Sequence, residues 1–218
     1  MRKNMITCVE NQDLVNSLFK RSEYEEVVRL VLNNEINVNV VDCVGNDVVI
    51  RLLKAKQYDF VMEIMKKKNW NVNHKNIDGN IFGHILAHDD SAMAIKVMEQ
   101  LTKKKNYLPN IKNNRGETAM DIALSNHYLS TAFKILEDKR FDNIDILSFK
   151  NLLNVTLKNK LYGKYSKIMN LTIIVSNLEK KNLDIKVKEL VETIRKNMEA
   201  IKNDIMNNRL FLLESIVQ

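Results

Sequence analysis

The stretches NVVDCVG (Asn39–Gly45), NHKNIDG (Asn73–Gly79) and NIKNNRG (Asn110–Gly116) share one pattern, an Asn and a Gly separated by five residues. The three glycines are 34 and 37 residues apart. A pattern that returns every ~20–50 residues is typical of repeat proteins, in which one small unit is copied and stacked. The sequence therefore predicts a repeat architecture.

The segments around these stretches repeat as well. NQDLVNSLF (Asn11–Phe19) aligns with GNDVVIRLL (Gly45–Leu53) at an offset of 34. Apolar residues three and four positions apart within Val27–Val31 and Val61–Met65 predict helices. Each unit thus reads as a helix, a tight turn, a second helix and a polar loop, and such a unit hides its apolar face only against its neighbours. We expect an all-α fold.

Composition excludes several classes of protein. One Pro and five Gly are too few for a compact all-β fold with many tight turns, and two Cys are too few for a disulfide framework. The first residues carry no apolar core of a signal peptide, and no apolar run approaches the ~20 residues that span a bilayer. We expect a cytoplasmic or nuclear protein without a membrane span.

The unit NRGETAMDIALSNHYLSTAFKILED (Asn114–Asp138) resembles the ankyrin repeat, whose period is about 33 residues. The residues that occupy the family's positions are Gly116, Thr118, Ala123, Ile135 and Leu136. The resemblance implies a β-turn hairpin followed by two antiparallel helices, stacked into a solenoid. It also implies that His84, at the family's histidine position, forms hydrogen bonds between neighbouring hairpins.

The resemblance and the period give a domain plan. Residues 1–10 are an N-terminal extension, and four ankyrin-like repeats span 11–42, 43–76, 77–113 and 114–146. Residues 147–182 form a degenerate fifth repeat without the hairpin glycine. Residues 183–218 carry an amphipathic seam that predicts a capping helix or helix pair, with a free dimerisation zipper as the alternative; the seam comprises Val187, Val191, Ile194, Met198, Ile201, Ile205 and Leu212.

Ankyrin arrays bind partners through the hairpin tips and the concave face of the first helices, and the resemblance transfers this to two sets of residues. The expected tip residues are Val44, Asn46, Ile77, Asp78, Asn80, Asn114, Arg115 and Glu117. The expected exposed residues of the first helices are Arg51, Lys54, His88, Ser125 and His127. Ile77 is the strongest contact candidate, because it is a large apolar group with no core to fill.

A second pattern, three lysines followed by Asn and an aromatic residue, occurs twice at a spacing of 37 residues. The two Lys-rich stretches are Lys66-Lys67-Lys68-Asn69-Trp70 and Lys103-Lys104-Lys105-Asn106-Tyr107. As structural features, the lysines offset the helix dipole, the asparagines adopt the left-handed C-cap conformation, and the aromatics pack between repeats. As a functional feature, the six lysines align into a basic ridge that suits acidic peptides or phosphates. We favour the structural interpretation.

Charge is also uneven, since residues 147–218 hold 13 Lys and Arg against 7 Asp and Glu. A basic segment could attract nucleic acid or an acidic protein, but we favour a solvated helical face, because acidic and basic residues alternate along the segment.

Signatures of catalysis are missing from the sequence. It has no phosphate-binding Gly-rich loop, no Gly-x-Ser-x-Gly and no His-Glu-x-x-His. His84 and His88 have the spacing of two zinc ligands, but the family role of His84 is structural. We expect no catalytic residues, cofactor, metal or small-molecule substrate, and no enzyme.

The leading hypothesis is a protein–protein interaction module, such as a scaffold, an inhibitor or a regulatory subunit. The alternatives are a nucleic-acid-associated or transcription-regulating ankyrin protein, and a pathogen-encoded ankyrin effector that binds a host protein.

Overall fold

The computed structural model describes residues 8–142, 144–159 and 162–217, and within them the chain is all-α, with no β-strand beyond an isolated bridge between Val41 and Asp47. Residues 1–7 of the predicted N-terminal extension lie outside the described part. The helices are α1 (Cys8–Lys20), α2 (Tyr24–Leu32), α3 (Val48–Lys54), α4 (Tyr58–Ile64), α5 (Phe82–Leu86), α6 (Ala92–Thr102), α7 (Ala119–Ser125), α8 (Leu129–Glu137), α9 (Ile146–Lys158), α10 (Lys164–Leu178), α11 (Ile185–Lys196), α12 (Met198–Met206) and α13 (Phe211–Val217).

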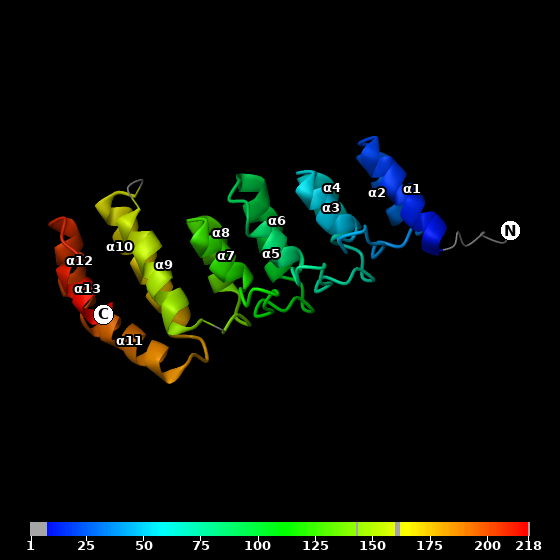
Figure 1. Ribbon diagram of the computed structural model, residues 1–218. Coiled ribbons are helices and arrows are strands. Elements are labelled where there is room, and N and C mark those ends of the chain that lie inside the picture. The colour runs from blue at the N-terminus through cyan, green and yellow to red at the C-terminus, as the bar shows by residue number, and fades with distance from the viewer. Residues whose placement is uncertain (1–7, 143, 160–161, 218) are drawn as a thin grey trace.

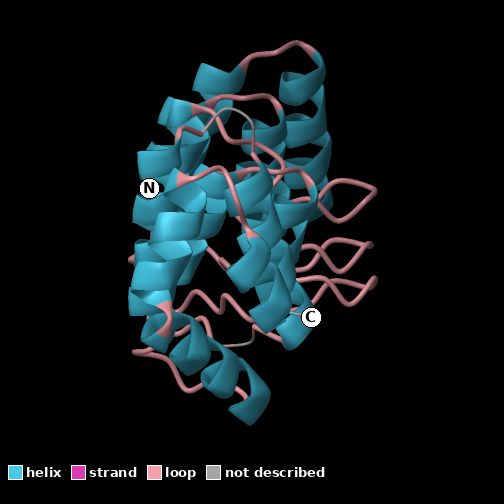
Figure 2. Cartoon of the chain, turned by 90° about the vertical axis from the view of Figure 1, so that its left-hand side faces the viewer, coloured by secondary structure: helices cyan, strands magenta, loops and turns pink. Residues whose placement is uncertain are grey.

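Successive helices pair, and the pairs stack in chain order (Figure 1). The first helices form an inner layer in which α3 packs on α5, α5 on α7 and α7 on α9. The second helices form an outer layer that runs α2, α4, α6, α8 and α10. Long loops between the pairs project beyond one end of the inner layer, as Figure 2 shows from the side. The stack therefore has a helical body and a row of projecting loops.

The inner helices α3, α5 and α7 have only five to seven residues, which is too short for stability in isolation. Packing holds them, because Val49, Leu52 and Met120 are fully buried. Capping defines their starts: Asp47 accepts a hydrogen bond from the Ile50 amide, and Thr118 accepts one from Asp121.

The two Lys-rich stretches, residues 66–70 and 103–107, follow α4 and α6. Trp70 and Tyr107 are buried. The Trp70 ring packs edge-on against Phe82 of the next repeat, and Arg140 of the next repeat lies over the Tyr107 ring, which confirms packing between repeats. The expected left-handed conformation at Asn69 and Asn106 is wrong: Asn34 has a φ of 57°, but neither Asn69 nor Asn106 has a positive φ. The carbonyls of Asn69 and Asn106 instead accept hydrogen bonds from the side chains of Asn39 and Asn73 in the preceding repeats, so side chains of the neighbouring repeat hold these turns.

The last helices close one end of the stack, since α11 packs on α9 and α10, and α12 packs on α10. Most of the apolar seam is buried, but the register shifts at α13, where Leu213 rather than Leu212 is fully buried. The shift has a local cause, because Asn208 breaks the seam with a φ of 57°. The seam faces the stack and not open solvent.

Candidate functional site

Three projecting turns form the most regular surface of the molecule. We call them fingers 1, 2 and 3, and they span residues 42–46, 76–80 and 113–117. In each finger the first side chain accepts hydrogen bonds from two backbone amides: Asp42 from Val44 and Asn46, Asn76 from Asp78 and Asn80, Asn113 from Arg115 and Glu117. A glycine with positive φ completes each turn. Each finger is therefore held in shape from within.

Each finger also binds the next one. The Ile77 amide donates to the Val44 carbonyl at 3.2 Å, and the Asn114 amide donates to the Asp78 carbonyl at 3.0 Å. The Asn76 side chain donates to Asn46 at 3.1 Å. Because every finger rests on its neighbour, the row is a hydrogen-bonded ladder and its tips lie at fixed positions.

His84 ties the ladder to the inner helices. Its ring is buried, its Nδ1 accepts from the Ile81 amide, and its Nε2 lies 3.0 Å from the Glu117 carbonyl, to which it donates. Burial lowers the pKa of His84, although the bond to Glu117 opposes that shift. The predicted hydrogen bonding between hairpins is confirmed, and both ring nitrogens are occupied.

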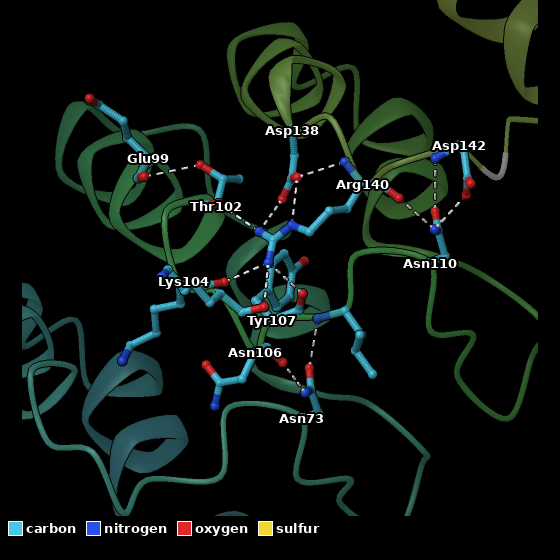
Figure 3. Close-up of polar contacts among 12 residues, drawn as sticks. Asn73, Glu99, Thr102, Lys104, Asn106, Tyr107, Asn110, Asp138, Arg140 and Asp142 are labelled. Carbon is cyan, nitrogen blue, oxygen red and sulfur yellow. Dashed lines mark hydrogen bonds and ion pairs between the residues drawn. The ribbon is translucent and has the colours of Figure 1, made fainter. Parts of the chain in front are cut away.

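Below the fingers, one asparagine per repeat bridges to the following repeat. The Asn73 side chain donates to the Asn106 carbonyl at 2.6 Å and accepts from the Leu108 amide at 3.0 Å (Figure 3). Asn39 and Asn110 form the equivalent pairs of bonds one repeat earlier and one repeat later. The three asparagines that open the repeated pattern are thus the rungs between repeats.

Beside these asparagines, cations from three successive repeats each cover a buried aromatic side chain of the repeat before. The Lys104 ammonium lies 5.5 Å from the Trp70 ring, and the Arg140 guanidinium lies 5.9 Å from the Tyr107 ring. Lys181 covers Phe141 in the same way. Sequence reasoning missed Arg140 and Lys181. Arg140 follows Lys104 by 36 positions, close to the repeat period, whereas Lys181 follows Arg140 by 41 positions and gave no such signal.

The tips divide into exposed residues and residues inside the ladder. Ile77 is 63% exposed and Val44 is 38% exposed, and Asp78, Asn114 and Arg115 are also exposed. The expectation that Asn46, Asn80 and Glu117 are free for binding is wrong. Asn46 is buried, and Asn80 and Glu117 are half-buried, because their side chains accept bonds from the next or the same finger.

The first-helix candidates lie apart from the tips. Arg51 is half-buried, donating to Asn16 at 2.9 Å and stacking on Phe19 at 3.9 Å, so its expected exposure is wrong. The other four candidates are exposed and lie at or just after the C-terminal ends of α3, α5 and α7; they are Lys54, His88, Ser125 and His127. They line the far end of the inner layer from the fingers.

The predicted ridge of six lysines is not uniform. The Lys67 ammonium turns inward and donates to the Val31 carbonyl at 2.7 Å, which neutralises the C-terminal end of α2. Lys104 is half-buried over Trp70, and Lys103 is paired with Glu99 at 2.7 Å. The remaining exposed lysines of the ridge are Lys66, Lys68 and Lys105.

The described residues contain no group of three or more His, Cys, Asp or Glu side chains placed to hold a metal ion, and no helix among them is long and apolar enough to cross a membrane. A scan against protein-family models finds no match, and a search of curated proteins finds no match either. The geometry of the fingers is therefore the main guide to function.

Proposed function

We propose that this chain is a non-catalytic, ankyrin-type module that binds another protein through the tips of its fingers. The observation that carries the proposal is the exposure of Val44 and Ile77 on two fingers joined by a backbone hydrogen bond. An exposed apolar pair on ordered loops is typical of a contact surface.

Preorganisation supports this role. A binding loop that is ordered beforehand avoids part of the entropy cost of association. In this chain Asp42, Asn76 and Asn113 each hold two amides of their own finger, so the tips need little further ordering. Burying a side chain such as that of Ile77 contributes roughly 1.5–3 kcal/mol.

The exposed candidates of the inner layer extend the proposed surface. His88 and His127 lie beyond the ends of α5 and α7, and His88 faces the Asn126 amide at 3.5 Å. A helix of seven residues is about 10 Å long, so a partner that contacts both the tips and this row crosses the width of the inner layer.

The experiment is affinity capture with the purified wild-type chain, Ile77→Asp and Met169→Asp. Met169 is the matched control, because it is apolar and 58% exposed but lies on α10, away from the fingers. We expect Ile77→Asp to bind the captured protein at least tenfold more weakly, and Met169→Asp to bind it as the wild type does. Equal binding by Ile77→Asp would refute the role of the tips.

The nucleic-acid alternative is tested in the same samples. Binding through phosphates weakens steeply as salt rises, and in this chain it would use Lys66, Lys68 and Lys105. We expect the variant in which all three lysines are changed to Gln to capture the protein as the wild type does, at both ~50 and ~200 mM salt. Three phosphate contacts would instead lose about 40-fold in affinity over this range of salt. Capture of nucleic acid that disappears in this variant would favour the alternative.

A further inference from the structure

A recess of about 590 Å³ lies between the ends of the outer helices α6 and α8. Its lining contains three carboxylates, and each is paired with a cation at 2.7–2.9 Å; the pairs are Glu99–Lys103, Glu137–Lys134 and Asp138–Arg140. The two remaining cations of the lining, Lys105 and Lys139, are exposed, and no described residue accepts a hydrogen bond or an ion pair from either ammonium group. The recess therefore has two positive charges that no carboxylate in its lining balances.

These two lysines belong to a row with one member in each of three successive repeats. The row is Lys68, Lys105 and Lys139, and each member lies two positions before a buried aromatic residue. The residue that follows each lysine is held by the same contact, because its carbonyl accepts a hydrogen bond from an asparagine of the preceding repeat; these are Asn39, Asn73 and Asn110. The three lysines therefore occupy equivalent positions, and Lys68 is also exposed without a described acceptor.

The spacing of the row follows from the packing of the outer helices. α4 packs on α6 and α6 packs on α8, and the axes of packed helices lie about 8–10 Å apart. Equivalent lysines therefore recur at about this distance. A nucleic acid carries its charges far more densely, at one per ~1.7 Å of duplex axis. The row also offers no ring for bases to stack on, because Trp70, Tyr107 and Phe141 are buried.

An extended polypeptide matches this spacing when every third residue is acidic. A polyproline II chain has three residues per turn and rises about 3.1 Å per residue, so carboxylates on every third residue lie about 9 Å apart on one side of the chain. Acid-rich segments of low hydrophobicity do not fold alone, and this extended conformation is a major conformer of such chains. The row therefore fits an acidic chain better than a nucleic acid.

We propose that Lys68, Lys105 and Lys139 bind an acidic, extended segment of a second partner protein. Successive carboxylates of this segment accept from the three ammonium groups, and two of them lie at the recess between α6 and α8. The proposal goes beyond the proposed function, because the row follows the ends of the outer helices and uses neither Val44 nor Ile77. Its ligand is separate from the protein that the tips bind.

The test uses a synthetic peptide of five Glu-Pro-Ala units, in which every third residue is acidic. It is titrated into the ¹⁵N-labelled full chain at low salt, where exposed charges are least screened, and followed by amide chemical shifts. Exposed ion pairs are individually weak, so we expect a millimolar Kd, with shifts at the amides of Lys68, Lys105 and Lys139. A peptide of the same composition with its five Glu residues consecutive should bind at least threefold more weakly, because its carboxylates do not match the row.

Two double variants with the same net charge separate the row from the overall charge of the chain. Lys105→Glu/Lys139→Glu should weaken binding of the spaced peptide at least tenfold, with an otherwise wild-type spectrum. Lys20→Glu/Lys56→Glu is the matched control, because both lysines are exposed but lie where the first helices α1 and α3 end, away from the row. It should bind within threefold of the wild type.

Several outcomes overturn the proposal. They are the absence of shifts at the three lysines with millimolar peptide, equal or tighter binding of the grouped peptide, and unchanged binding by Lys105→Glu/Lys139→Glu. Single-stranded oligothymidylate with the same number of charges is titrated in parallel; tighter binding of it at the same amides would assign the row to nucleic acid and also overturn the proposal. Ile77→Asp should bind the spaced peptide normally, so a failure here is distinct from a failure of the tip surface.

Discussion

The guanidinium of Arg140 donates to the main-chain oxygens of Thr102, Lys104 and Tyr107 and pairs with the Asp138 carboxylate at 2.7 Å. One side chain thus closes the C-terminal turn of α6 and links it to the end of α8 (Figure 3). The Asp138 side chain is almost fully buried, whereas that of Arg140 is one-third exposed. This contact joins the third and fourth repeats.

Arg140→Ala should lower the free energy of unfolding by about 2–3 kcal/mol, because it leaves several carbonyls without a donor and leaves the buried Asp138 carboxylate with the amide of residue 140 in place of a paired cation. Urea denaturation followed by circular dichroism measures the change. Lys139→Ala is the control, since Lys139 is exposed and should change stability by less than about 0.5 kcal/mol. Equal effects of the two variants would show that Arg140 does not hold the repeats together.

Tyr107→Phe should leave stability unchanged or raise it by about 1 kcal/mol. The Tyr107 hydroxyl is buried without a hydrogen-bond partner among the described residues, and an unsatisfied buried group costs about 1–3 kcal/mol. The equivalent Trp70 donates its Nε1–H to the N-cap Asp47 at 2.9 Å, whereas Tyr107 meets a repeat whose N-cap is Ile81. A loss of more than 1 kcal/mol in thermal or urea denaturation would contradict this account of the core.

Gly79→Ala should destabilise the chain more than Gly116→Ala. Both residues have positive φ, which costs a non-glycine residue roughly 1 kcal/mol. Only at Gly79 does the added Cβ also collide with Asn114, at 2.8 Å from its amide nitrogen. Denaturation midpoints of the two variants measured side by side give the difference, and an equal loss would mean that finger 3 does not rest on finger 2.

The contribution of His84 to stability should fall as pH falls from 7.5 to 5.5. Burial lowers the pKa of His84 in the folded chain below its unfolded value of about 6.5. Below that value the unfolded chain takes up a proton that the folded chain does not, so unfolding becomes easier. His84→Gln removes this titration, and the gap in stability between wild type and variant should therefore narrow on acidification. A constant gap would refute the linkage.

The three repeated Asn-x5-Gly stretches could be predicted from the sequence, because the role of each residue in them depends on its local backbone conformation or burial. Gly45, Gly79 and Gly116 each adopt a positive φ, which favours glycine. The helical spacing of apolar residues within Val27–Val31 corresponds to burial of one helix face. The exposure of Ile77 was also predictable, because the residue lies at the tip of a turn. Predicting these features does not require knowing which repeats contact each other.

The features that were not predicted depend on contacts between repeats. Asn46 and Asn80 look like surface polar residues, but they are buried or half-buried because the next finger donates to them. The Arg51 side chain donates a hydrogen bond to Asn16 and stacks on Phe19, both on α1. Leu147, the second residue after the N-cap Asp145, is 65% exposed, whereas the equivalent Val49 and Met120 are fully buried, and apolar spacing alone does not predict that difference.

Amide hydrogen exchange of the isolated chain tests most directly whether the fingers are ordered before any partner binds. The amides of Val44, Asp78 and Arg115 lie at exposed tips, yet each donates to a side chain of its own finger. We predict slowed exchange at all three, with protection lost at Asp78 and retained at Val44 in Asn76→Ala. Exchange of these amides at the rates of an unstructured peptide would contradict the account.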